Sequence, residues 1–240
     1  MSVKIEGFTK RYKDFLAVED FSMECREGQI TGILGPNGAG KTTILKAICG
    51  RHFATSGTVI VNETEAEEEI EDVRNSTGFV MEEPDLPGEY TVQEYLQTVL
   101  SLHNSEKVTG DYVKNLFEKL SLDELKSKKI KKLSKGQKQR VNFAQALIYN
   151  PKVLVLDEPA TGLDPAQILT MRKLVQSLKQ NHTILISTHL MQEVEALCDY
   201  IYIMNHGRCV AKGTKEQIIL TTNAINLEEA FFKLTAGTNE

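Results

Sequence analysis

A glycine-rich segment near the N-terminus constrains the fold more than any other feature of the chain. Residues 35–43 are Gly-Pro-Asn-Gly-Ala-Gly-Lys-Thr-Thr, between the strand-like run 29–34 and a helical pattern at 41–49. Glycines between a buried strand and a helix let successive backbone N–H groups turn toward an anion, and the helix N-terminus adds partial positive charge. An ordinary glycine-rich turn would not account for the strand and helix on either side. The segment therefore predicts a phosphate-binding loop in an α/β fold.

Two side chains of this loop suit a nucleotide and its metal ion. Lys41 is placed to reach the β- and γ-phosphates, and the Thr42 hydroxyl is placed to ligate Mg²⁺. The whole segment is a candidate for nucleotide contact, namely Gly35, Pro36, Asn37, Gly38, Ala39, Gly40, Lys41, Thr42 and Thr43.

An acidic pair follows a second apolar run. Residues 153–156 are Val-Leu-Val-Leu, and apolar side chains at every position are typical of a parallel strand buried on both faces. Asp157 and Glu158 then lie at the carboxyl end of that strand, where α/β sheets bind ligands. Asp157 is expected to hold Mg²⁺, directly or through water, and Glu158 to polarise an attacking water. A surface acidic pair that caps the next element is the alternative.

His189 follows a further strand-like run, residues 183–187, so it is expected to project from the same sheet edge as Asp157. A lone histidine after a strand is usually structural. Because the phosphate loop and the acidic pair are predicted at that edge, we interpret His189 as a contact to the γ-phosphate.

The composition limits the compartment and the partners. The 240 residues are 41% hydrophobic and 25% charged, as in ordinary globular proteins, and the net charge of −5 argues against nucleic acid as the main partner. The four cysteines are scattered without metal-binding or disulfide spacing, which predicts buried free thiols in a reducing cytoplasm. No run approaches the roughly 18 apolar residues of a membrane span, so any work at a membrane requires another chain to cross it.

The remaining patterns predict one parallel-sheet unit with an inserted helical lobe. Residues 84–150 carry helical patterns without a strong strand, whereas strand-like and helical runs alternate after residue 150. The acidic run 63–72 is interpreted as solvated surface. Further expected strands are 3–7, 17–24, 58–61 and 200–204, and expected helices are 92–102, 112–120, 165–180 and 191–198.

One motif, Leu-Ser-Lys-Gly-Gln at residues 133–137, has no use within the chain's own nucleotide site. With the phosphate loop and the acidic pair, it resembles the nucleotide-binding subunit of ATP-binding cassette (ABC) transporters, over nearly the whole chain. The motif is similar to the family's LSGGQ signature. The other correspondences are 35–43 with Walker A, 153–157 with Walker B, 162–164 with the D-loop, Glu158 with the catalytic glutamate and His189 with the switch histidine.

The resemblance implies a P-loop NTPase (RecA-like) core with a parallel sheet, an N-terminal antiparallel β subdomain and an inserted α-helical subdomain. It implies a single ABC ATPase domain over residues 1–240. Within it, the nucleotide-binding α/β core with the β subdomain would take residues 1–83 and 151–220. The helical signature subdomain would take 84–150, and a short C-terminal tail 221–240.

The resemblance also implies ATP and Mg²⁺ as ligands and a head-to-tail pair of cassettes. Ser134 and Gly136 of one cassette would cover the γ-phosphate held by Lys41 of the other. Lys135, Gln137 and Asp164 would lie beside the same nucleotide.

Three further positions are interpreted through the family's pattern. Lys135 replaces a glycine of the signature, and an active site is still expected because Ser134 and Gly136 are intact. Glu82 replaces the glutamine of the family's Q-loop; its carboxylate can reach Mg²⁺ or a water on it, but it lacks the amide's donor. Tyr12 takes the place of the family's adenine-stacking aromatic, and a core tyrosine is the alternative.

The expected function is an ATPase subunit that drives a separate membrane-spanning permease. It would work in a homodimer or a heterodimer of cassettes, in the cytoplasm and peripherally on the cytoplasmic face of the membrane. The Glu82 region and residues 84–102 would form the surface that contacts the permease. The length, the short helical lobe and the ending at 226–235 are similar to the ATPases of ABC-2-type exporters.

Three alternatives remain. A soluble ABC ATPase acting on ribosomes, DNA or another protein is favoured only by the basic run 126–132. A regulatory module with a silent site would lack a catalytic residue. A small-molecule kinase would not need residues 133–137.

Overall fold

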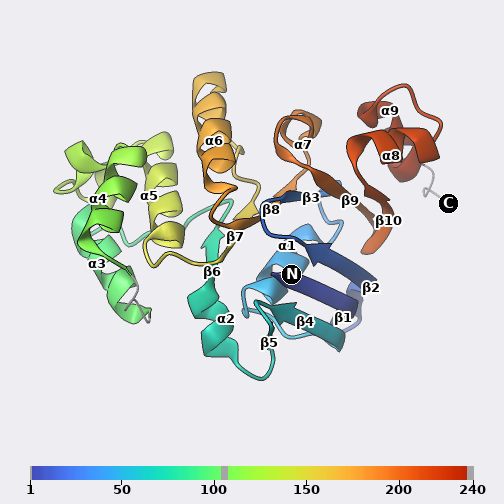
Figure 1. The fold of residues 1–240 in the computed structure, drawn as a ribbon, viewed down its shortest axis with the longest axis horizontal. Coiled ribbons are helices and arrows are strands. Elements are labelled where there is room, and N and C mark those ends of the chain that lie inside the picture. The colour runs from blue at the N-terminus through green and yellow to red at the C-terminus, as the bar shows by residue number, and fades with distance from the viewer. Residues whose placement is uncertain (1, 104–107, 237–240) are drawn as a thin grey trace.

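The computed structural model describes residues 2–103 and 108–236, which form a six-stranded sheet beside a four-stranded sheet (Figure 1). The strand order of the larger sheet is β10-β9-β3-β8-β7-β6, with every pair parallel except β10 and β9. The central strands β3 (Ile30–Leu34), β7 (Val153–Asp157) and β8 (Thr183–Thr188) are buried at every residue. The predicted covered parallel sheet is thereby confirmed. Its outer strands are β6 (Thr77–Val80), β9 (Tyr200–Asn205) and β10 (Arg208–Gly213).

The smaller sheet is antiparallel, in the order β2-β1-β4-β5, as the resemblance implied. Its first two strands, β1 (Val3–Tyr12) and β2 (Phe15–Cys25), are longer than the expected strands 3–7 and 17–24. The register shifts at three places between them, which interrupts the alternation of buried and exposed side chains. Its other strands are β4 (Ser56–Val61) and β5 (Thr64–Glu65). The helix α1 (Lys41–Ile48) lies between the two sheets, in contact with β2 and β4 and with β7 and β8.

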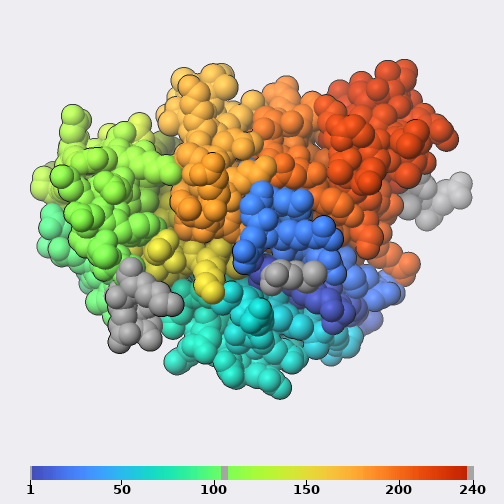
Figure 2. All heavy atoms as spheres, viewed as in Figure 1, coloured from blue at the N-terminus to red at the C-terminus, as the bar shows by residue number. Residues whose placement is uncertain are grey.

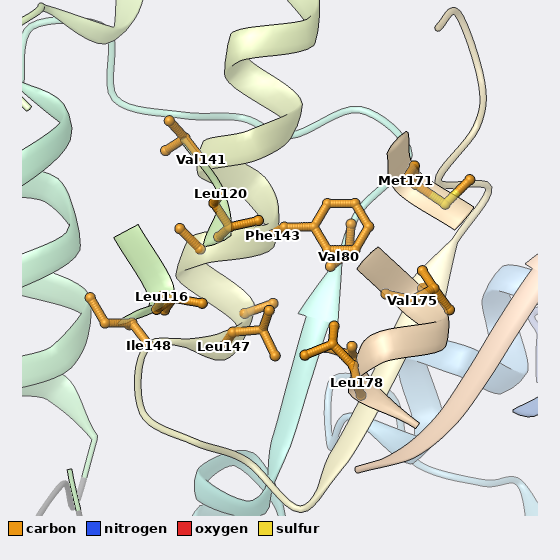
Figure 3. Packing of buried hydrophobic residues seen from close by; sticks show 14 of the residues in the cluster. Val80, Leu116, Leu120, Val141, Phe143, Leu147, Ile148, Met171, Val175 and Leu178 are labelled. Carbon is orange, nitrogen blue, oxygen red and sulfur yellow. The ribbon is translucent and has the colours of Figure 1, made fainter. Parts of the chain in front are cut away.

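The inserted lobe consists of α3 (Val92–Leu102), α4 (Gly110–Lys119) and α5 (Lys135–Leu147), with 3-10 turns at Asp123–Leu125 and Ile130–Lys132. Figure 3 shows that Phe143 of α5 lies against Met171 and Val175, with Val80 of β6 beside them. Met171 and Val175 belong to α6 (Pro165–Leu178), a helix of the core. The helical lobe and the sheet therefore share one hydrophobic core, which fixes α5 relative to β6 and α6.

The C-terminal part contains structure that the sequence analysis did not predict. After α7 (Met191–Leu197), the chain forms α8 (Lys215–Thr221) and α9 (Leu227–Thr235), so the expected tail includes a helix. Leu227 and Ala230 are buried in a cluster with Ile201 and Ile203 of β9, because α9 is amphipathic. Figure 2 shows these helices (red) at the end of the molecule opposite the helical lobe (green).

The acidic run is exposed at five of its carboxylates from Glu67 to Asp72, which confirms a solvated surface, although it also contributes to β5 and to α2 (Ile70–Ser76). The four cysteines are free thiols, of which Cys25 and Cys49 are buried and the other two half-buried. Burial raises the pKa of Cys25 to about 12. Within residues 2–103 and 108–236, no helix has the length and apolar character needed to cross a membrane.

Candidate nucleotide-binding site

The glycine-rich loop leaves β3 and turns sharply before α1. Gly38 and Gly40 have φ angles of +80° and +99°, a conformation that other residues rarely adopt. A Cβ atom on Gly40 would lie 2.7 Å from the Ala17 carbonyl oxygen, so only glycine fits. The helix has no side-chain cap at Gly40 and no acidic residue in its first turn. Its first N–H groups therefore lack a side-chain acceptor, as a phosphate site requires.

Lys41, the first residue of α1, is held under this loop. Its ammonium donates to the carbonyl oxygens of Gly35 and Pro36, at 2.8 and 3.2 Å. It also lies 3.2 Å from Glu158 Oε1, and both side chains are only 6% exposed. The ammonium is therefore fixed between the loop and a carboxylate at the end of β7.

Asp157 lies where β7 ends, at the point where the neighbouring strands β3 and β8 also end. Its Oδ1 accepts hydrogen bonds from Ser187 Oγ at 2.6 Å and from Thr42 Oγ1 at 3.2 Å. Oxygen atoms from three elements thus meet at one point, which is the donor set that Mg²⁺ prefers. Sequence reasoning missed Ser187, and its only signal was a hydroxyl at the end of an otherwise apolar strand.

Glu158 is buried and has a φ angle of +45°, in the left-handed region that non-glycine residues enter at a cost of about 1–3 kcal/mol. Its Oε2 accepts hydrogen bonds from His189 Nδ1 at 2.9 Å and from the His189 N–H at 3.3 Å. Because a carboxylate only accepts, His189 Nδ1 is the donor in this contact. The other oxygen, Oε1, lies near Lys41 without hydrogen-bond geometry and has no hydrogen-bond partner among the residues that the structure describes. A buried oxygen of this kind is suited to accept from a water or a substrate.

Glu82 belongs to the loop after β6 and is exposed. Partial burial raises its pKa, and the neighbouring carboxylates of Glu158, Asp157 and Glu83 raise it further. The acidic pair is therefore close enough to repel the Glu82 carboxylate, and a cation between these groups would relieve that repulsion.

The signature residues are ordered by contacts within their own subunit. Ser134 caps α5: its Oγ accepts from the Gln137 N–H at 3.3 Å, and Gln137 Oε1 accepts from the Ser134 N–H at 3.0 Å. The ammonium of Lys135 lies over Gly162, and a Cβ atom on Gly136 would lie 2.6 Å from Gln167 Nε2. Within the described part of the chain, no hydrogen bond or ion pair joins residues 133–137 to the glycine-rich loop or to Glu158.

Two other residues predicted to contact the nucleotide, Tyr12 and Asp164, have contacts elsewhere in the described structure. Tyr12 ends β1 and is 39% exposed, so the alternative of a core tyrosine is wrong. Its ring meets His52 edge-on at 5.8 Å. Asp164 caps α6, where its Oδ1 accepts from the Gln167 N–H at 2.9 Å. Nucleotide contact by either residue stays a prediction.

Together, the fold and this site define a P-loop nucleotide-binding protein. A family model described as ABC transporter matches residues 18–161. The chain therefore belongs to the ABC transporter family, as one of its ATP-binding cassettes.

Individual relatives agree with this assignment. The chain is 38% identical over 219 residues to Nod factor export ATP-binding protein I of Burkholderia orbicola, covering 90% of this chain and 72% of the relative. The solved structure of an ATP-binding subunit of an ABC transporter covers 98% of this chain and 99% of that one, with a TM-score of 0.90 and 28% identity. The dimeric post-hydrolysis structure of the cassette MJ0796 bound to ADP and Pi covers 88% of this chain and 98% of that one, with a TM-score of 0.80 and 25% identity.

Proposed function

We propose that this chain hydrolyses ATP with Mg²⁺ at the edge where β3, β7 and β8 end. The observation that carries the proposal is Glu158: a buried carboxylate held by His189, close to Lys41, with one oxygen that has no hydrogen-bond partner. The loop N–H groups and Lys41 would hold the phosphates, and Thr42, Asp157 and Glu82 would hold the metal ion. When bound, that ion supplies charge to neutralise the phosphate oxygens. Glu158 would orient the attacking water and accept its proton.

A second copy of a cassette is part of this proposal. Among the described residues, no hydrogen bond or ion pair joins residues 134–137 to the glycine-rich loop of their own subunit, and a similar cassette has been solved as a dimer. Head-to-tail pairing, with this chain or with a different cassette, would place Ser134 over the terminal phosphate at Lys41 of the other copy. Loss of that phosphate would then release the pair.

The Glu158→Gln substitution tests both parts. We expect kcat to fall at least about a hundredfold while ATP still binds, because the base is lost and the phosphate loop is intact. Sedimentation should then show an ATP-dependent dimer. Glu19→Gln, at an exposed carboxylate paired with Arg208, is the control and should leave turnover unchanged. Parental turnover in the Glu158→Gln protein would show that Glu158 has been assigned wrongly.

The work done by hydrolysis is proposed to be transport through a separate membrane-spanning permease of the ABC-2 exporter type. Two findings support this: the relative named for Nod factor export, and a cavity of about 510 Å³ between the core and the helical lobe. The cavity is lined by Phe79 of β6 and Val99 of α3, and the Arg51 guanidinium lies 4.8 Å over the Phe79 ring. An inserted permease segment would contact both the strand that leads to Glu82 and the predicted surface 84–102. The chain would thus sit peripherally on the cytoplasmic face of the membrane.

Gentle solubilisation of native membranes with a tagged chain tests the permease. A stoichiometric polytopic membrane protein is the expected companion, and purely ribosomal or soluble companions would favour the soluble ATPase instead. The basic run 126–132 was the feature that favoured a soluble ABC ATPase, and the structure weakens that argument. Three of its five lysines, Lys126, Lys129 and Lys131, form ion pairs with Asp123 or Glu89, so these two carboxylates offset part of its charge.

A further inference from the structure

One face of α5 carries a line of amide side chains. Gln139, Asn142 and Gln145 are spaced three residues apart, so they follow one another along the same side of the helix. Asn142 is fully buried, at 0% exposure, and the other two are half-buried. Polar side chains in this position need hydrogen-bond partners, and these three find them in one another and in three other segments.

The hydrogen bonds form a continuous series. Gln139 Nε2 donates to the Pro159 carbonyl oxygen at 3.2 Å, and Asn142 Nδ2 donates to Gln139 Oε1 at 3.2 Å. Gln145 Nε2 donates to Asn142 Oδ1 at 2.9 Å, and the Tyr95 hydroxyl donates to Gln145 Oε1 at 2.6 Å. We call this series, Gln139–Asn142–Gln145–Tyr95, the amide relay.

Asn142 has a second bond that leaves the helix. Its Nδ2 also donates to the Met81 carbonyl oxygen, at 2.7 Å. Both amide hydrogens are therefore used, and the amide oxygen accepts from Gln145, so the orientation of this side chain is fully determined.

The partners of the relay are neighbours of the catalytic groups. Pro159 directly follows Glu158, and Met81 directly precedes Glu82. Tyr95 lies on α3, within the surface proposed to contact the permease. One connected set of hydrogen bonds therefore joins both acidic loops of the site to α3.

We propose that Asn142 is a positioning residue that sets the Glu82 loop against the Glu158 loop, and that the amide relay couples both loops to α3. The inference rests on the proposed ATPase function and extends it, because it assigns a physical connection between hydrolysis and the docking surface. A shift of α3 that pulled Tyr95 from Gln145 would free the Gln145 amide and loosen Asn142. The Met81 carbonyl, and with it Glu82, would then lose its fixed position.

A double-mutant cycle with Asn142→Ala and Glu82→Gln tests the positioning role. Asn142→Ala should lower kcat about tenfold and change KM for ATP less than about twofold, because the phosphate loop is untouched. In the Glu82→Gln background the same substitution should change kcat less than about twofold, since the group it positions is already altered. Full multiplication of the two effects would overturn the proposal.

A milder pair of variants covers the case in which Asn142→Ala does not fold. Tyr95→Phe removes only the hydroxyl at the end of the relay. Tyr112→Phe is the matched control, because its hydroxyl donates to the Leu147 carbonyl oxygen of the same helix at 2.7 Å but lies outside the relay. We expect Tyr95→Phe to lower kcat about threefold and Tyr112→Phe to leave it unchanged. Equal losses would show that the relay only stabilises the lobe.

Hydrogen exchange measured by mass spectrometry tests the amide relay without depending on ATP turnover. Tyr95→Phe should speed exchange at residues 81–86 and 158–161, and Tyr112→Phe should not. Unchanged protection of both segments in Tyr95→Phe would overturn the inference. If the parent chain fails to hydrolyse ATP, the ATPase proposal is wrong, and this measurement still decides whether the relay positions the two loops.

Discussion

The helices α1 and α5 both begin with a lysine, yet the two N-termini differ in every other respect. Lys41 is buried and contacts two carbonyl oxygens and Glu158, whereas Lys135 is exposed and lies over Gly162. The first turn of α1 has no side-chain cap, whereas Ser134 and Gln137 cap that of α5 from both sides.

This difference shows two ways in which the N-terminus of a helix can be arranged to bind a phosphate. At α1 the first backbone donors have no side-chain acceptor among the described residues, so a bound phosphate would complete the local structure. At α5 the capping box of Ser134 and Gln137 already orders the first turn, and the side chains of Ser134 and Lys135 are exposed on its surface. A nucleotide would therefore bind first at α1, and α5 of a second copy would meet it without refolding.

The largest expected effect is a difference in ATP hydrolysis between the same substitution at Lys41 and at Lys135. Lys41→Met should lower ATP hydrolysis about a thousandfold, because the ammonium at the phosphates is lost. Lys135→Met, the same change at the corresponding position of α5, should lower it less than about threefold. Steady-state hydrolysis at matched protein concentration checks both. Losses of similar size would mean that the two helix N-termini act alike.

An intermediate effect is expected at the α5 cap. Ser134→Ala should lower the free energy of unfolding by about 1 kcal/mol, because the cap acceptor of the Gln137 N–H is removed. Thr214→Ala is the matched control, since Thr214 forms the same capping box with Gln217 at α8. Urea unfolding should show similar losses for both, and only Ser134→Ala should also weaken ATP-dependent dimerisation. Equal dimerisation by the two variants would contradict a role for Ser134 beyond the cap.

The smallest effect concerns Glu82, which is repelled by the two carboxylates that contact α1, those of Asp157 and Glu158. The pKa of Glu82 is raised in the folded chain, so its ionised form opposes folding, and this cost grows as pH rises through the folded pKa. Glu82→Gln should therefore raise the free energy of unfolding slightly at pH 8, by less than about 1 kcal/mol because the group is exposed. The gain should vanish near pH 3, below the ordinary pKa of a glutamate, where Glu82 is mostly protonated in both states. Urea unfolding at the two pH values measures this, and an equal gain at both would rule out the charge repulsion.

Sequence alone located the groups that stand at strand ends. Lys41, Asp157 and His189 follow the buried runs of β3, β7 and β8, and neighbouring parallel strands deliver their carboxyl ends to one edge. The structure brings these residues together as expected, with Thr42 and Glu158 among them. Their chemical roles remain predictions.

Features that depend on distant contacts could not be found in this way. β6 has four residues with a glycine among them, too short a signal to distinguish from a loop. The bond from Asn142 to the Met81 carbonyl spans 61 residues, and nothing in the local pattern at either end indicates the other. Ser187 was likewise hidden, because only the pairing of β7 with β8 places it at Asp157.

The position of Lys135 over Gly162 has a consequence for how chains of this kind change in evolution. Gly162 has a φ angle of +70°, and the Lys135 side chain occupies the space that any Cβ there would need. The lysine end is flexible and exposed and can move aside, so the φ angle is what makes a side chain at residue 162 strained, whichever residue stands at 135. A lineage can therefore change the lysine without freeing residue 162, because that position is restricted by its own backbone.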